Sequence, residues 1–122
     1  MFSLPILAGG KEHMNSNKKG SKGELELSHI LNDYGFTTRR GQQYCGANGD
    51  ADVIGLPGIH IECKRVERLN LEVAMEQAKS DANENEIPAV FHRKNRKSWN
   101  VTLSLDDFMK LYQKGESNGS KR

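Results

Sequence analysis

The stretch that decides the fold is residues 49–65, GDADVIGLPGIHIECKR. Two short runs within it, residues 51–55 and 59–65, contain the β-branched residues that strands favour. Leu56-Pro57-Gly58 separates the two runs, and a proline followed by a glycine is a turn signal. The stretch therefore predicts a β-hairpin with a short turn.

The register of this hairpin decides which side chains meet. Alternation along the second run puts Glu62 and Lys64 on one face, because successive side chains of a strand point to opposite sides. A two-residue turn would pair Asp52 with Cys63 and separate the two carboxylates. A three-residue turn ending at a left-handed Gly58, or a single bulge, would pair Asp52 with Glu62. We expect this second register.

Paired in this way, the hairpin would carry the donors of a metal site. The carboxylates of Asp52 and Glu62, with the main-chain carbonyl of Cys63, are the oxygen ligands that Mg²⁺ selects. An adjacent Lys64 side chain could orient a metal-bound water and stabilise phosphate charge as an ammonium, or deprotonate that water as a neutral amine. Glu24 falls on the apolar stripe of the first predicted helix, and a carboxylate directed at a sheet needs a partner such as a metal. Together these residues favour metal-assisted phosphodiester hydrolysis.

A simpler interpretation exists for each part. An acidic residue two positions before a lysine on a strand is commonly a surface ion pair worth about 0–1 kcal/mol. Asp50 and Asp52 can serve as turn formers after Gly49. The joint placement of the four side chains favours the catalytic interpretation over these alternatives.

Hydrophobic periodicity and capping residues predict the remaining elements. Ser21 is the expected N-cap of the first helix and Gly35 its stop, Asn70 caps the second helix, and Ser104 opens the last. The expected helices are residues 21–34, 71–82 and one after Ser104, and the further strands are 36–40, 89–91 and 99–103. This order predicts an α/β fold with a mixed central sheet flanked by helices: an αβββαβ core plus a C-terminal strand and helix.

Length and composition limit the class of protein. The 122 residues suit one domain, and no run approaches the roughly 18 apolar residues of a membrane span. Cys45 and Cys63 lack the paired spacing of a zinc site or a disulfide framework, which favours a cytoplasmic setting. We expect a leader at 1–19, with Met1–His13 derived from expression, a single domain at 20–113, and a disordered tail at 114–122.

The net charge of +2 conceals an uneven distribution of charge. Acidic residues gather in the second helix, and basic residues gather near the hairpin. A basic surface beside an acidic site suits binding to a nucleic-acid backbone. The expected DNA contacts are Lys18, Lys19, Lys22, Arg39, Arg40, Arg65 and Arg68. The basic turn at 93–97 is either a solvated turn or a further contact.

Four short motifs occur in an order and spacing that resemble a known family. They are KGSKGE at 19–24, GDADVI at 49–54, IECK at 61–64 and EQA at 76–78. Residues 19–103 resemble the archaeal-type Holliday junction resolvases, of the PD-(D/E)XK, restriction-endonuclease-like nuclease superfamily. The resemblance implies a homodimer that needs Mg²⁺, or Mn²⁺ in its place, and cuts a four-way DNA junction symmetrically during DNA recombination and repair.

The resemblance also implies a role for each motif residue. Glu24 matches the family's catalytic helix glutamate, Asp52 and Glu62 match its metal carboxylates, and Lys64 matches its lysine. Gln77 matches a glutamine near the active site, on the helix after the motif strands.

Two departures from the family pattern concern its proline and its catalytic serine. Ala51 stands where the superfamily name places proline, at a variable position. The loop at 41–49 has no serine, and Tyr44 and Asn48 are its polar candidates. Nuclease chemistry is therefore the firmer expectation, and the substrate the weaker one.

The expected function is thus a hydrolase, a structure-selective DNA endonuclease that resolves Holliday junctions. The alternatives are a nicking or flap and single-strand nuclease of the same superfamily, and a non-catalytic nucleic-acid-binding module. Cys63 is expected to pack on the buried side of its strand. The last helix could equally cap the sheet. The expected dimer interface draws on apolar residues whose default place is the core of the monomer. They are Ala89, Val90, Phe91, Trp99, Phe108, Met109 and Tyr112.

Overall fold

A computed structural model describes residues 20–41 and 51–120 of the chain. An N-terminal helix occupies residues 20–33 of the described part. The elements after it are β1 (Arg39–Arg40), β2 (Val53–Ile54), β3 (Ile59–Arg65), α2 (Leu71–Asp81), β4 (Ile87–Arg93), β5 (Asn100–Thr102) and α3 (Leu105–Ser120). This is the order that the sequence predicts. The expected leader at 1–19 lies outside the described residues.

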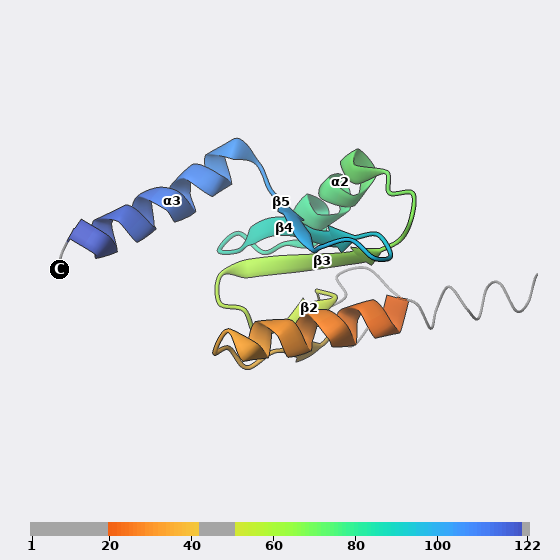
Figure 1. The fold of residues 1–122 in the computed structure, drawn as a ribbon. Helices are drawn as coiled ribbons and strands as arrows, with labels where there is room; N and C mark the ends of the chain where they lie inside the picture. The colour runs from red at the N-terminus through yellow and green to blue at the C-terminus, as the bar shows by residue number, and fades with distance from the viewer. Residues whose placement is uncertain (1–19, 42–50, 121–122) are drawn as a thin grey trace, which may run out of the picture.

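The five strands form one sheet in the order β1-β2-β3-β4-β5. Neighbours pair antiparallel except β3 and β4, which are parallel and are joined by α2. The N-terminal helix and α2 lie on opposite sides of the sheet (Figure 1). The prediction of an α/β fold with a mixed central sheet flanked by helices is confirmed.

Each face of the sheet is packed against a helix. Alternate residues of β3 separate the two sides, since Ile61 and Cys63 join the core beneath the N-terminal helix. On the other side Val90 packs against Ala74 and Ala78 of α2, whose small side chains allow the helix to approach closely. The predicted core position of Cys63, and of Ala89, Val90 and Phe91, is confirmed.

The hairpin has the expected register. Val53 pairs with Ile61, as that register requires, and the main-chain N–H of Asp52 donates to the carbonyl of Ile61 at 3.0 Å. The turn at 56–58 ends at Gly58, whose φ of 77° is left-handed, as a three-residue turn requires.

Gly55 allows β1 to lie close against this hairpin. Its φ is 110°, and a Cβ added there would collide with the carbonyl oxygen of Thr37 and lie 2.9 Å from Cα of Thr38. Only glycine combines this backbone conformation with so close an approach.

Three of the four predicted helix boundaries are confirmed. Gly35, at φ 103°, ends the N-terminal helix, and the N–H of Phe36 donates to the carbonyl of Leu31 at 3.3 Å. Asn70 and Ser104 cap their helices by accepting main-chain N–H bonds at 3.2 Å. The prediction for Ser21 is wrong: it lies inside the helix, and its Oγ accepts a 3.1 Å bond from Arg40 instead.

Strand lengths differ from expectation at four places. β2 and β5 are shorter than the expected runs 51–55 and 99–103. Of residues 36–40 only Arg39–Arg40 form a strand, since main-chain N–H of Thr38 donates to the Asn32 side chain instead of to a strand. β4 is longer than expected, because it pairs with all seven residues of β3.

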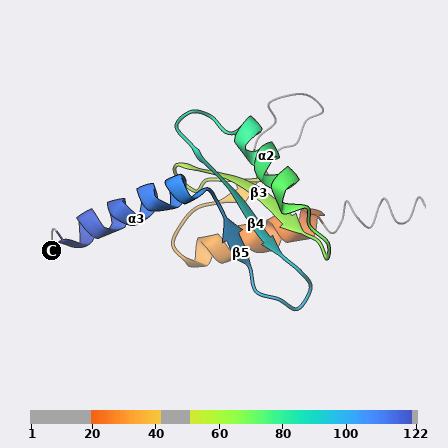
Figure 2. The ribbon, with the colours of Figure 1, turned by 90° about the horizontal axis from the view of Figure 1, so that it is seen from above.

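Helix α3 extends away from the sheet (Figures 1 and 2). Its apolar side chains Leu105, Phe108, Leu111 and Tyr112 are exposed, so the alternative in which this helix caps the sheet is wrong. Residues 114–120, for which composition predicts a disordered tail, continue the helix, whose backbone bonds need no tertiary partner. Among residues 20–41 and 51–120, no helix has the length and apolar character to cross a bilayer.

Candidate active site

The predicted catalytic residues surround a single cleft. Its volume is about 440 Å³, and its walls come from the N-terminal helix, β3, α2 and the start of β2. All five predicted catalytic side chains and the additional predicted metal ligand line it: Glu24, Asp52, Glu62, Lys64, Gln77 and Cys63. The fold thus brings together residues that lie up to 53 positions apart, from Glu24 to Gln77.

Asp52 and Glu62 form the centre of the cleft. Both are buried, with 8% and 4% of their surfaces exposed. The Asp52 carboxylate accepts a 2.8 Å hydrogen bond from the main-chain N–H of Cys63. This bond fixes Asp52 beside the residue that follows Glu62, so both carboxylates face the same space.

Lys64 places a positive charge beside this pair. Its Nζ lies 3.4 Å from Oε2 of Glu62, two residues earlier on the same strand face. The lysine side chain is one-third exposed whereas Glu62 is buried, so the ammonium group lies at the solvent side of the carboxylates.

Glu24 enters the site from the N-terminal helix. As predicted it is buried, with 8% of its surface exposed. Arg40 of β1 donates through Nε to Glu24 Oε1 at 3.1 Å. Arg40 is held in place because Thr38, two residues earlier, is bonded to the helix through the carbonyl of Ser28 and the side chain of Asn32.

Close packing aligns this helix with β3. A Cβ on Gly23 would lie 2.9 Å from Cβ of Arg65, so the helix and strand approach at a position that tolerates no side chain. The neighbouring Glu24 is thereby carried to the level of Glu62 and Lys64.

The carboxylates oppose one another's ionisation. Burial, and next the negative charge of Asp52, raise the pKa of Glu62 to about 7, against the smaller opposing effect of Lys64. Burial likewise raises the pKa of Glu24, although Arg40 counters it. Burial and the nearby carboxylates also raise the pKa of the Cys63 thiol. Converging carboxylates that disfavour each other's charge fit a divalent cation, which would favour their ionised forms.

Gln77 contributes an amide to the rim of the cleft. It lies on α2, one residue before the buried Ala78, and is itself exposed to solvent. Its side chain is neutral and offers both a donor and an acceptor.

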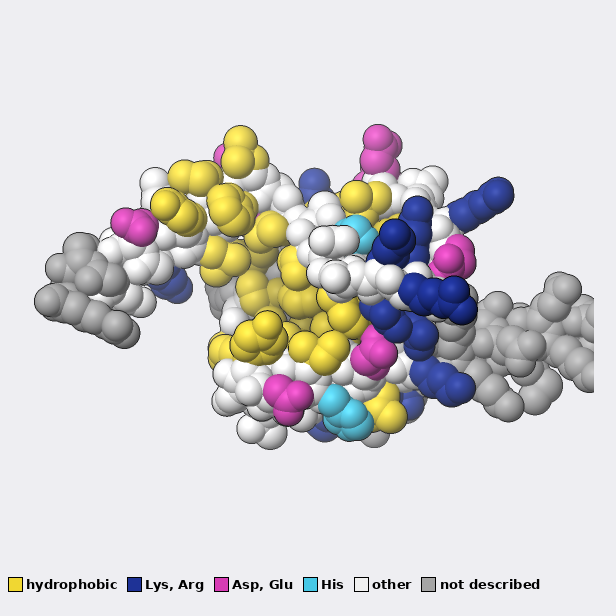
Figure 3. Space-filling view, viewed as in Figure 1, with side chains coloured by type: hydrophobic (Ala, Val, Ile, Leu, Met, Phe, Trp, Pro, Cys, Tyr) yellow, Lys and Arg dark blue, Asp and Glu magenta, His cyan; other side chains and the backbone are white. Residues whose placement is uncertain are grey.

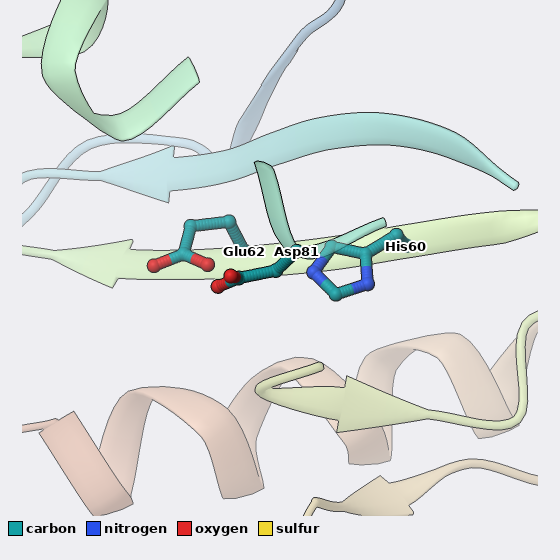
Figure 4. Close-up of side chains that lie close together, drawn as sticks. All are labelled: His60, Glu62 and Asp81. Atoms are coloured by element: carbon teal, nitrogen blue, oxygen red, sulfur yellow. The ribbon is translucent and has the colours of Figure 1, made fainter. Parts of the chain in front are cut away.

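A second group shares Glu62 and was missed by sequence reasoning. His60, Glu62 and Asp81 each place a ligand atom within 4.8 Å of the others (Figure 4). The strand period did place His60 on the Glu62 face, but its spacing from the other histidines matches no metal motif. Asp81 is the last residue of α2, and only the return of the chain above β3 brings it close.

Arg65 lines the cleft, and basic side chains gather on this part of the surface. Figure 3 shows them over the end of the molecule where β3 ends and the N-terminal helix begins. Of the expected DNA contacts, Lys22, Arg39, Arg40 and Arg68 are exposed and Arg65 is half-buried, whereas Lys18 and Lys19 lie outside the described residues.

Two of the basic residues are engaged within the protein. Arg40 contacts Glu24, as described above. In the turn at 93–97, Arg93 lies 3.0 Å from Glu26 and 5.9 Å from the ring centre of Trp99. Trp99 packs against the core and donates a hydrogen bond to Glu26. The Arg93 end of the turn is therefore held against the protein.

The loop that departs from the resolvase pattern begins at the buried Gly41. Tyr44, Cys45 and Asn48 lie outside the described residues.

Comparison with known proteins adds no relative: no protein-family model and no curated protein matches this chain.

Proposed function

We propose that this chain is a divalent-metal-dependent endonuclease that hydrolyses phosphodiester bonds in branched DNA, with the four-way junction as its preferred substrate. The observation that carries the proposal is that the buried carboxylates of Asp52 and Glu62 line one cleft beside Lys64, together with Glu24. The helix, three strands, α2 and β4 would form a restriction-endonuclease-like core of the PD-(D/E)XK type, as the motif resemblance implies.

The donor set suits Mg²⁺, with Mn²⁺ able to replace it. Asp52 and Glu62 would hold the ion with the main-chain carbonyl of Cys63, and Glu24 would complete the acidic cluster. A bound dication would activate a water and neutralise the charge that develops on the phosphate.

Lys64 would orient the attacking water and contribute a positive charge. Its Nζ is held 3.4 Å from Glu62 and one-third of its side chain is exposed, so it can meet a phosphate oxygen entering from solvent. An ammonium at this position would stabilise negative charge in the transition state more than in the ground state. Gln77 would orient the substrate through its amide.

DNA would bind through its backbone. Lys22, Arg65 and Arg68 lie near the end of the cleft, where they could contact phosphates on either side of the cut. Such contacts carry no base information, so the shape of the junction would select the substrate, and affinity would fall steeply with salt.

A homodimer is the third part of the proposal. Symmetric cutting of a junction needs two active sites, and each protomer has one. Exposed apolar side chains along α3 offer a surface for association (Figure 3), among them Phe108, Met109 and Tyr112.

The test is cleavage of a synthetic four-way junction, labelled on each strand in turn, against a linear duplex of the same sequence. We expect paired symmetric cuts in Mg²⁺, none in EDTA, and loss of product in Glu62→Gln and Asp52→Asn. Glu72→Gln on α2 is the matched control, since it removes an exposed carboxylate outside the cleft.

Other results would replace the proposal with a specific alternative. Cuts confined to flaps or single strands would identify a nuclease with another substrate. Tight binding of junctions by well-folded wild-type protein, with no product in Mg²⁺ or Mn²⁺, would identify a non-catalytic binding module and contradict the nuclease assignment.

A further inference from the structure

A histidine lies inside the fold beside two carboxylates, on the α2 side of the sheet. His60 and Glu62 are alternate residues of β3 and so share a face, and Asp81 reaches them from the end of α2. One ligand atom of each lies within 4.8 Å of the other two. His60 and Asp81 do not line the cleft described above, so this group is a separate feature that shares Glu62 with it.

One nitrogen of His60 has no hydrogen-bond partner among the described residues. Only 4% of the side chain is exposed, and Nδ1 lies 3.6 Å from Oε1 of Glu86. Within the part of the chain that the structure describes, Nε2 is fully buried and forms no hydrogen bond. Burying a polar atom without a partner costs about 1–3 kcal/mol, so such an atom calls for an explanation.

The orientation of the ring explains the unpartnered nitrogen. The ring nitrogen farther from the main chain is directed toward Asp81, and the Asp81 and Glu62 carboxylates point toward each other (Figure 4). The Glu86 carboxylate lies on the Nδ1 side of the ring, so Nε2 is the nitrogen that remains for a metal. A lone pair and two carboxylates that converge repel one another unless a cation lies between them.

We propose that His60 Nε2, Glu62 and Asp81 form a binding site for a first-row transition-metal dication, of which Zn²⁺, Mn²⁺ and Co²⁺ are the probes. One imidazole and two carboxylates make a mixed nitrogen and oxygen donor set, which suits these ions better than Mg²⁺. The ion would join the end of α2 to the middle of β3. The site exists whether or not the chain is a nuclease, since two of its three ligands lie outside the proposed active site.

The test is Co²⁺ titration of the full chain, stripped with EDTA and dialysed, in the presence of excess Mg²⁺ to occupy the cleft. Visible absorption reports Co²⁺ bound by protein ligands, and calorimetry gives the affinity for Zn²⁺. A Cys45→Ser background removes the thiol that could otherwise bind these ions. We expect one saturable site that His60→Gln and Asp81→Asn each abolish, and that Glu86→Gln weakens by roughly 10- to 100-fold.

Controls separate this site from the others. His29→Gln removes an exposed imidazole from the N-terminal helix and should leave Co²⁺ binding unchanged. Asp52→Asn should abolish DNA cleavage while keeping the Co²⁺ spectrum, so the failure of either proposal is distinguishable from failure of the other.

Circular dichroism establishes which variants are folded. If His60→Gln is unfolded, the Co²⁺ titration of Asp81→Asn tests the proposal. This variant should fold, because Asp81 is only partly buried at a helix end. Binding that is equal in wild type and in a folded Asp81→Asn or His60→Gln protein would overturn the proposal. So would the absence of Co²⁺ binding by the wild type.

Discussion

The Asp52 carboxylate accepts a 2.8 Å hydrogen bond from the main-chain N–H of Cys63, the residue after Glu62, beside the pairing of Val53 with Ile61. The pairing depends on a turn with one left-handed glycine and on a second glycine against which β1 packs. Two buried acids are therefore held together by backbone geometry, although their charges repel.

Gly55→Ala should destabilise the protein more than Gly58→Ala. Both substitutions place a side chain at positive φ, at a cost of about 1–2 kcal/mol. At Gly55 the new methyl group also collides with the main chain of Thr37 and Thr38, which should add about 1–3 kcal/mol. Open space surrounds Gly58, so it is the matched control. Urea unfolding measures the free energy of unfolding of both variants. Equal losses of stability in the two would contradict the packing argument.

The metal-free protein should lose stability as pH rises from about 4.5 to about 7. Glu62 has a pKa of about 7 when folded and an ordinary value of 4.5, so the folded state retains a proton that the unfolded state releases. Stabilisation from the protonated acid is complete below pH 4.5 and is lost as pH rises toward 7. Unfolding free energies measured across this range should show the slope in wild type and a weaker one in Glu62→Gln.

Two controls accompany this pH series. Glu72→Gln removes an exposed carboxylate of α2 and should keep the wild-type slope. Saturating Mg²⁺ should reduce the slope, because a bound cation stabilises the ionised carboxylates of the folded state. A slope that is unchanged in Glu62→Gln would show that another group governs it.

Arg40→Gln should alter the pH profile of cleavage, whereas Arg39→Gln should not. Arg40 bonds to Glu24 and lowers its pKa, so its removal should raise that pKa and shift the acidic limb of the rate profile upward in pH. Arg39 is exposed on the same strand, and its loss should only weaken binding to DNA. Rates under single-turnover conditions test the pair, and identical profiles would assign Arg40 to DNA binding alone.

The Cys63 thiol should resist alkylation in the folded protein. It is buried, and nearby carboxylates raise its pKa, so little reactive thiolate forms. In a Cys45→Ser background, a thiol reagent should react slowly with native protein and rapidly in urea. Fast reaction of the native protein would contradict the burial of this strand face.

Phe108→Asp should disrupt the proposed dimer. It introduces one negative charge among the exposed apolar side chains of α3, where Phe108 and Tyr112 stack at 6.1 Å. Lys110→Gln is the matched control, since it changes the net charge by the same amount on the exposed helix. Light scattering gives the mass, and a wild type that stays monomeric with and without junction DNA would contradict the dimer.

The hairpin and its acids could be predicted because their causes are local. A proline and glycine turn, an alternating strand and a helical stripe suffice to bring Asp52, Glu62 and Lys64 onto one face and to bury Glu24.

Features that depend on tertiary placement could not be predicted from local pattern. Asp81 reaches His60 only because α2 returns above β3, and no spacing in the sequence encodes that approach. Arg40 looks like one basic residue among several until β1 is docked against the helix. The apolar stripe of α3 is equally compatible with a buried or an exposed helix.

The three-residue turn at 56–58 also limits where homologous sequences can gain or lose residues. Adding or deleting one residue there would shift Asp52 to the opposite side of the sheet from Glu62, since side chains alternate along a strand. In any set of homologous sequences the spacing between these two acids should therefore stay constant at ten positions. Insertions and deletions should accumulate elsewhere, and a homologue with a different spacing should also lack one of the two acids.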